Sequence, residues 1–106
     1  MVQITEVFRG LADPTRRAVF ESLAHHGEAT VSQVTARFSV SQPAISQHLA
    51  ALRSAGLVLA RKDGRHVFYR ADPAGLAPLA DWIGHYERFW RGRLARLDDL
   101  LQEMDP

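Results

Sequence analysis

The chain has 106 residues, of which 46% are hydrophobic and 24% charged, and its formal net charge at pH 7 is +1. This composition predicts one globular domain and excludes a disordered or fibrous chain, because enough apolar residues are present to form a core. The sequence contains no cysteine, which excludes disulfides, thiolate zinc sites and cysteine nucleophiles among these residues. No apolar run is long enough to cross a membrane and no secretory signal pattern is present, so we expect a cytoplasmic protein without membrane contact.

Two helices are predicted over the first 27 residues. Apolar residues at helical intervals indicate the first helix, over residues 2–11. The second helix follows Asp13, a suitable N-cap that precedes a proline, and we expect it to end at Gly27. The pair His25–His26 falls in its last turn, and we interpret these histidines as capping or surface residues.

A short third helix and a longer fourth helix are predicted next. Thr30 and Gln33 have the spacing of a capping box, which marks the start of the third helix. Ser41 is a suitable N-cap for the fourth helix, which we expect to run from about residue 42 to 55 before Gly56 stops it.

The pattern then changes from helix to strand and back. Residues 57–72 alternate in polarity on either side of Asp63–Gly64, a dipeptide that indicates a two-residue hairpin turn. From about residue 73 to 104 the apolar residues are again spaced by three or four. This spacing predicts a last helix of about 30 residues, or about 45 Å.

Basic residues are concentrated in the part of the chain that contains the fourth helix and the hairpin. Between positions 37 and 70 there are six Lys or Arg residues and one acidic residue, Asp63. A local basic patch suits a polyanion, because neutralising phosphates supplies most of the sequence-independent affinity for nucleic acids. The alternative interpretation is an ordinary solvated surface.

The fourth predicted helix has an uncharged polar face. On a helical wheel Ile45, Leu49 and Leu52 share one narrow sector, and the opposite side carries Gln, Ser and small residues. Such side chains suit the base edges of a DNA major groove, where donors and acceptors alternate. A short helix, a tight turn and a helix of this kind predict a helix-turn-helix over residues 30–55. The residues expected to face the major groove are Gln42, Pro43, Ser46 and Gln47.

The hairpin is expected to act as a wing that reaches a phosphate or the minor groove next to the fourth helix. The predicted fold class is therefore mainly α with a β-hairpin: a single winged helix-turn-helix domain over residues 1–106, with four helices, two strands and a long helix in that order. His48 flanks the apolar sector, so a packed or phosphate-adjacent histidine is favoured over one that reads bases. The expected backbone or wing contacts come from Thr30, Ser32, His48, Arg61, Lys62, Arg65 and His66.

Three linked segments resemble the ArsR/SmtB family of bacterial winged-helix repressors. They are LADPTRRAVFESL, SQPAISQHLAALRSAGLV and RKDGRHVFYRAD, and the resemblance covers about residues 4–72. It implies a homodimer that pairs through the first and last helices, at residues 1–11 and about 76–104, and that represses transcription at a palindromic operator. It also implies that the residues expected above at the major groove and, from the wing, Lys62, Arg65 and His66 contact DNA.

The last predicted helix is unusually rich in aromatic residues. The segment DWIGHYERFW carries them on more than one side, so we expect them to be buried against both the core of their own domain and a second subunit. A dimer seam is favoured here over a ligand-binding cavity. The expected dimer contacts are Ile4, Val7, Phe8, Ile83, Tyr86, Trp90, Leu94, Leu97 and Leu101.

The metal sites for which the resembled family is known are not reproduced in this sequence. Thiolate-sensing members carry Cys-x-Cys in the third helix, where this chain has Thr30 and Ser32, whose hydroxyls bind soft ions poorly. In the last helix, Asp81, His85 and Glu87 could hold a metal across a two-fold interface, although such i,i+4 pairs are common surface contacts. We expect no cofactor and no metal, with a metal-responsive repressor using these three residues as an alternative.

The sequence carries no pattern of an enzyme. It has no Gly-rich phosphate loop, no nucleophile elbow and no Ser-His-acid or paired-carboxylate arrangement in a plausible pocket. It therefore predicts a sequence-specific regulator that binds double-stranded DNA, with a homodimeric repressor as the leading form. The alternative from another class is a winged-helix module that binds a protein partner, but interaction surfaces usually present larger apolar anchors than this Gln/Ser face.

Overall fold

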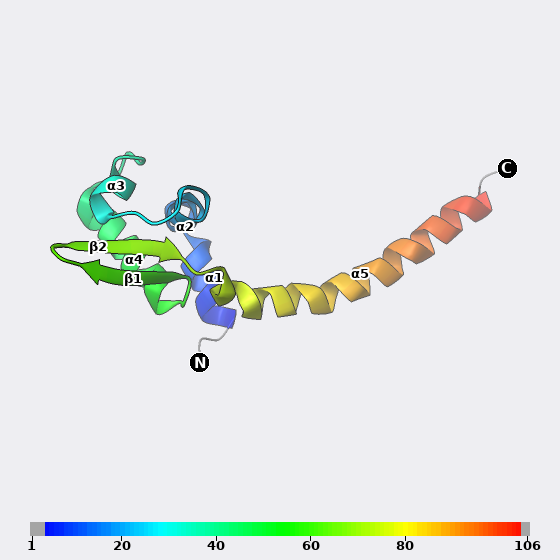
Figure 1. The fold of residues 1–106 in the computed structure, drawn as a ribbon. Helices are drawn as coiled ribbons and strands as arrows, with labels where there is room; N and C mark the ends of the chain where they lie inside the picture. Colours follow the sequence, from blue (N-terminus) through cyan, green and yellow to red (C-terminus); the bar gives the residue numbers. More distant parts are fainter. Residues whose placement is uncertain (1–3, 105–106) are drawn as a thin grey trace.

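The computed structural model describes residues 4–104 and shows a helical domain with one hairpin and a long terminal helix (Figure 1). The first four helices and the hairpin gather at one end, and the last helix extends away from them, so that the molecule measures 70 × 31 × 20 Å. This order confirms the predicted winged-helix arrangement; residues 2 and 3 of the first predicted helix lie outside the described residues. The elements are α1 (Ile4–Ala12), α2 (Pro14–His26), α3 (Val31–Thr35), α4 (Gln42–Ser54), β1 (Val58–Asp63), β2 (His66–Ala71), the 3₁₀ turn η1 (Pro73–Leu76) and α5 (Ala77–Met104).

Three helices begin at the side-chain caps that the sequence predicted. Asp13 accepts a hydrogen bond from a backbone N–H in the first turn of α2 at 2.9 Å, and this bond is the main reason why the pKa of its carboxyl lies below the ordinary value. Thr30 and Gln33 form both bonds of the capping box, at 2.9 and 3.2 Å. Ser41 accepts from the first turn of α4 at 3.3 Å. These caps satisfy N–H groups that a helix start otherwise leaves without a partner.

The two arginines after Pro14 close the end of α1. Nη1 of Arg16 donates to the carbonyl oxygen of Arg9 at 3.1 Å, and Nη1 of Arg17 donates to that of Leu11 at 2.8 Å. The last carbonyl groups of a helix lack partners within it. The segment LADPTRR therefore ends one helix and starts the next.

The core lies where α1, α2, α3, α4 and the start of the hairpin meet. The predicted inner face of α4 is confirmed, because Ile45, Leu49 and Leu52 are fully buried. Val7 of α1 is also fully buried, so the expectation that it contacts a second subunit is wrong: it belongs to the core of its own chain. The largest fully buried side chains are Leu23, Ile45, Leu49, Leu52, Leu57, Val7, Val19, Val34 and Val58.

The hairpin turn is displaced by one residue from the predicted position. β1 and β2 pair antiparallel with Asp63 opposite His66, so the loop consists of Gly64–Arg65 and not of Asp63–Gly64. Gly64 has φ +61°, and no non-glycine residue in the described range has a positive φ. A glycine with positive φ at the first loop position is the pattern of a type II′ turn. Asp63 is therefore the last residue of β1 and not part of the loop.

Ala29 forms an isolated antiparallel bridge to β2 of the two-stranded sheet. Its N–H and carbonyl groups bond to the carbonyl and N–H groups of Tyr69 at 2.9 and 2.8 Å. The connection between α2 and α3 is thereby attached to β2.

Gly75 permits a close approach between η1 and the turn after α4. A Cβ atom on Gly75 would lie 2.0 Å from the carbonyl oxygen of Gly56, so the backbone would have to move. We expect Gly75→Ala to lower the free energy of unfolding by about 1–3 kcal/mol, the usual cost of overpacking, as measured by urea denaturation. Gly84→Ala is the matched control, because a Cβ atom there meets nothing within 4 Å. Equal stability of the two variants would contradict the close approach.

The aromatic residues of α5 differ from expectation, because none is buried against the core of its own chain. α5 has no buried residue within the described range, and Trp82 and Trp90 are 46% and 57% exposed. The reason is geometric: the helix touches the rest of the molecule near its start, where Phe8 of α1 meets Trp82 edge to face at 5.5 Å, and then extends outward (Figure 1). Within residues 4–104, no helix is both long and apolar enough to span a bilayer.

Candidate nucleic-acid interface

The outward face of α4 carries all four residues predicted for the major groove. Gln42, Pro43, Ser46 and Gln47 are exposed, whereas the opposite side of the helix is fixed in the core. The face bears no charge, and the side chains of Gln42, Ser46 and Gln47 both donate and accept hydrogen bonds. It can therefore approach a surface closely and distinguish the donor and acceptor patterns of base edges.

His48 is partly buried and lies apart from that face. Its Nδ1 is buried without a hydrogen-bond partner among the described residues. The charge of His48 also contributes to the low pKa of Asp13, after the larger effect of the backbone N–H of Arg16. His48 therefore lies close to the start of α2, as a packed histidine would.

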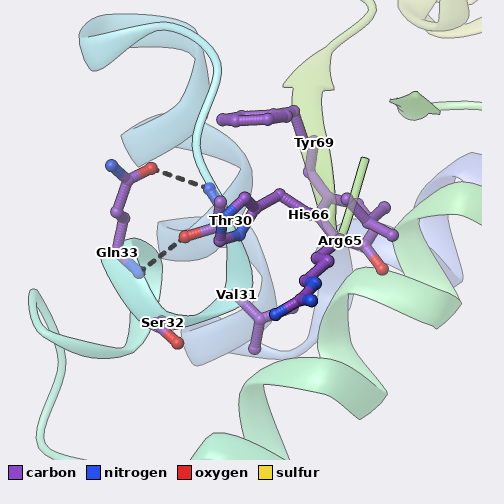
Figure 2. A pocket seen from close by; sticks show the side chains of 9 residues that line it. Thr30, Val31, Ser32, Gln33, Arg65, His66 and Tyr69 are labelled. Atoms are coloured by element: carbon purple, nitrogen blue, oxygen red, sulfur yellow. Dashed lines mark hydrogen bonds between the residues drawn. The ribbon is translucent and has the colours of Figure 1, made fainter. Parts of the chain in front are cut away.

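A groove of about 490 Å³ lies between the start of α3 and the hairpin (Figure 2). Thr30 and Gln33 bond to each other within it. Ser32, Arg65 and His66 are exposed hydrogen-bonding side chains on its two walls. A hydroxyl, a guanidinium and an imidazole are suited to phosphate oxygens. The groove is lined by Thr30, Val31, Ser32, Gln33, Arg65, His66, Val67, Phe68 and Tyr69.

The end of the hairpin presents three of the four basic residues predicted there. Lys62, Arg65 and His66 are exposed at or beside the turn. The fourth, Arg61, is also exposed, with 52% of its side chain accessible, but its guanidinium is paired with Glu28. Its Nε and Nη2 donate to the two carboxylate oxygens of Glu28 at 2.8 and 2.7 Å.

This ion pair shifts the pKa values of both partners and favours their charged forms. The hydrogen bond from Arg61 is the main reason why the pKa of the Glu28 carboxyl lies below its ordinary value, and the same bond raises the pKa of Arg61. The sequence analysis missed Glu28, because the two residues are 33 positions apart. The pairing of Ala29 with Tyr69 brings them together, and a single bridge of this kind has no sequence pattern of its own.

The three residues considered for a metal in the last helix do not gather into a site. Within the described range, no group of three or more His, Cys, Asp or Glu residues is placed to hold an ion. Glu87 pairs with Arg91 one turn along α5. His85 packs edge-on against Tyr86 at a centroid distance of 5.0 Å.

The second surface of interest is a continuous apolar stripe along α5. The predicted dimer contacts on this helix are about half exposed, and a hollow of about 470 Å³ on it is lined by Trp82, Ile83, Tyr86, Glu87 and Trp90. Phe8 of α1 is 41% exposed beside the start of the stripe. A contiguous apolar patch of this kind marks an interaction site. The α5 residues concerned are Ile83, Tyr86, Trp90, Leu94, Leu97 and Leu101.

Comparisons with known proteins agree with this architecture. A family described as a helix-turn-helix domain matches residues 11–60. The HTH-type transcriptional regulator Rv2034 of Mycobacterium tuberculosis is 42% identical over 94 residues, which cover 89% of this chain and 84% of that protein. The arsenical resistance operon repressor of Escherichia coli is 44% identical over 68 residues, which cover 64% of this chain and 58% of that relative.

The fold of a solved relative is also similar. The ArsR-like transcriptional regulator from Rhodococcus sp. RHA1 superposes with a TM-score of 0.73 at 34% identity, over 91% of this chain and 90% of that one. The helix-turn-helix, the hairpin beside it and these likenesses show that the chain belongs to the ArsR family of winged-helix DNA-binding transcriptional regulators and repressors, which are not enzymes.

Proposed function

We propose that the protein is a homodimeric repressor that reads a palindromic operator and that does not sense metals through cysteine. The observation that carries the proposal is the exposed, uncharged face of α4, with Gln42, Ser46 and Gln47 on a helix whose other side is fully buried. A glutamine can bond adenine in two places in the major groove, and small neighbours allow the helix to approach.

The groove between α3 and the hairpin supports a contact with the DNA backbone next to the bases. Ser32, Arg65 and His66 would bond phosphate oxygens there, while Lys62 adds charge beside the hairpin turn. Contacts of this kind fix the position of a protein on the duplex without reading its sequence.

The apolar stripe on α5 supports the assembly into dimers. A second copy that covered the same stripe would bury it and create a two-fold axis, as most homodimers do. Two α4 helices would then contact half-sites about 34 Å apart, which is one turn of DNA. An operator read in this way is an inverted repeat.

A thiolate metal site is not part of the proposal. The sequence contains no cysteine, and Thr30 accepts a bond in the capping box of α3 at 3.2 Å. Hydroxyl groups are poor ligands for soft ions. We therefore propose that soft metal ions and metalloid species such as arsenite do not release this protein from DNA through α3.

The proposal is tested by titrating purified protein against a duplex enriched from a random pool, at several salt concentrations. Because several phosphates are neutralised, log affinity should fall linearly with log salt, with a slope of several units. Binding that did not depend on salt, or that was equal for an unselected duplex, would contradict the proposal.

Substitutions should separate the residues that read bases from those that hold the backbone. We expect Gln47→Ala to reduce the preference for the enriched duplex by about 1–3 kcal/mol, since one bidentate base contact is lost. Arg65→Ala should weaken enriched and unselected duplexes equally and reduce the salt slope by about 1. Both variants are compared by competition titration, and the same behaviour in both would show that this division of roles is wrong.

A further inference from the structure

Glu28 has no role in the proposed function, yet it makes a bidentate contact across the fold. Nε and Nη2 of Arg61 donate to its two carboxylate oxygens at 2.8 and 2.7 Å. Two parallel bonds fix the orientation of the guanidinium as well as its distance. Because 33 positions separate the two residues, this pair joins parts of the chain that the backbone does not connect directly.

The pair spans the full width of the sheet. Arg61 lies in β1 opposite Phe68 of β2, and its guanidinium lies 4.7 Å from the centre of the Phe68 ring. Beyond β2, Ala29 forms its two backbone bonds to Tyr69. Arg61 therefore reaches over β2 to Glu28, the residue next to Ala29. This side-chain contact links β1 to the segment that the Ala29 bridge attaches to β2.

The same short segment also holds the start of the helix-turn-helix. Directly after Glu28 and Ala29, Thr30 caps α3. Three consecutive residues thus bind three elements: the first binds a side chain of β1, the second the backbone of β2, and the third the first turn of α3. The direction of the hairpin relative to α3 is set in this segment.

We propose that the Glu28–Arg61 pair is a positioning device for DNA binding, which holds the hairpin where Arg65 and His66 can meet the DNA backbone. The proposal rests on the proposed function, because that function assigns the hairpin to DNA. Glu28 carries a negative charge, so it would act through the position of the hairpin and not through a contact with phosphate. Loss of the negative charge of Glu28 should therefore weaken binding, although the change makes the protein more positive.

The sign of the effect separates positioning from simple electrostatics. We expect Glu28→Gln to bind the enriched duplex up to about fivefold more weakly, the largest factor that an exposed charge pair supplies. Glu21→Gln is the matched control: it adds the same charge at an exposed position of α2 and leaves the bonds from Arg61 to Glu28 and Asp63 in place. The control should bind as tightly as the unchanged protein or more tightly, because added positive charge favours DNA.

A second variant removes the bidentate contact between Arg61 and Glu28 without changing the net charge of the protein. Arg61→Lys keeps a cation but cannot form the bidentate contact, and it should weaken binding in the same direction as Glu28→Gln. In the free protein, hydrogen exchange at the amides of Ala29 and Tyr69 should be faster in both variants than in Glu21→Gln, while the melting temperatures of all three stay close together.

The results decide the proposal as follows. Glu28→Gln and Arg61→Lys that bind as tightly as Glu21→Gln, with unchanged exchange at Ala29 and Tyr69, would overturn it. Failure of the pool to yield any enriched duplex would instead count against the proposed function. The exchange rates of the free variants would then decide the positioning role alone: faster exchange supports it, and unchanged exchange overturns it.

Discussion

Replacing Leu97 by glutamate should convert the protein into single chains and lower its affinity for the enriched duplex by about 100-fold or more. Leu97 lies within the apolar stripe of α5 and is 52% exposed in the single chain. In a dimer seam the new carboxylate would be buried without a partner, which costs several kcal/mol. A 100-fold loss corresponds to about 2.7 kcal/mol, so this cost is sufficient. Sedimentation gives the oligomeric state and a titration gives the affinity.

A matched control adds the same charge elsewhere on the same helix. Gln102→Glu places a carboxylate near the same end of α5, about 140° around the helix from position 97, and should leave assembly and DNA binding unchanged. Dimers of Leu97→Glu that bind DNA normally would show that the stripe is not the seam. The proposal of pairing through α5 would then be wrong.

Leu49→Ala should strongly lower the stability of the protein. Leu49 is fully buried on the inner face of that helix, and removing a buried leucine typically costs about 2–5 kcal/mol. This cost is a large part of the about 5–15 kcal/mol that stabilises a typical domain. Urea denaturation measures the change in the free energy of unfolding.

The control for Leu49→Ala is a substitution on the exposed side of the same helix. Gln47 is exposed, so Gln47→Ala should change the free energy of unfolding by no more than about 0.5 kcal/mol. Equal losses in the two variants would mean that α4 is not held by its inner face. In that case its outer face would not be a fixed surface for reading DNA.

Local patterns in the sequence were sufficient to predict most of the framework. The caps at Asp13, Thr30 and Ser41 depend on residues three positions away, and the two faces of α4 follow from helical geometry. These features are short-range, so a single sequence contains them. The fold class and the family follow from the same linked segments.

Features that depend on distant parts of the chain were predicted less well. Val7 lies on an amphipathic helix that contacts both the core and α5, and its spacing alone does not show which side is buried. Arg61 was predicted to be a basic residue available to DNA. Its pairing with Glu28 was not predicted, because the bridge between Ala29 and Tyr69 brings the two residues together. The hairpin turn moved by one residue, since Asp–Gly allows glycine at either loop position.

The aromatic residues of α5 show a different limit of prediction from apolar spacing. Their spacing correctly indicated a long amphipathic helix, but spacing does not show how far a helix extends past the core that it begins on. The exposed stripe is the consequence, and the proposal of a second copy follows from it.

The central claim is that two copies of the α4 face read DNA from one rigid assembly, and sequencing the duplexes that the protein enriches from a random pool tests it most directly. We expect inverted repeats whose half-site centres lie about 10 base pairs apart, one helical turn. A pool that stayed random after repeated rounds, or that yielded single unpaired half-sites, would contradict the claim.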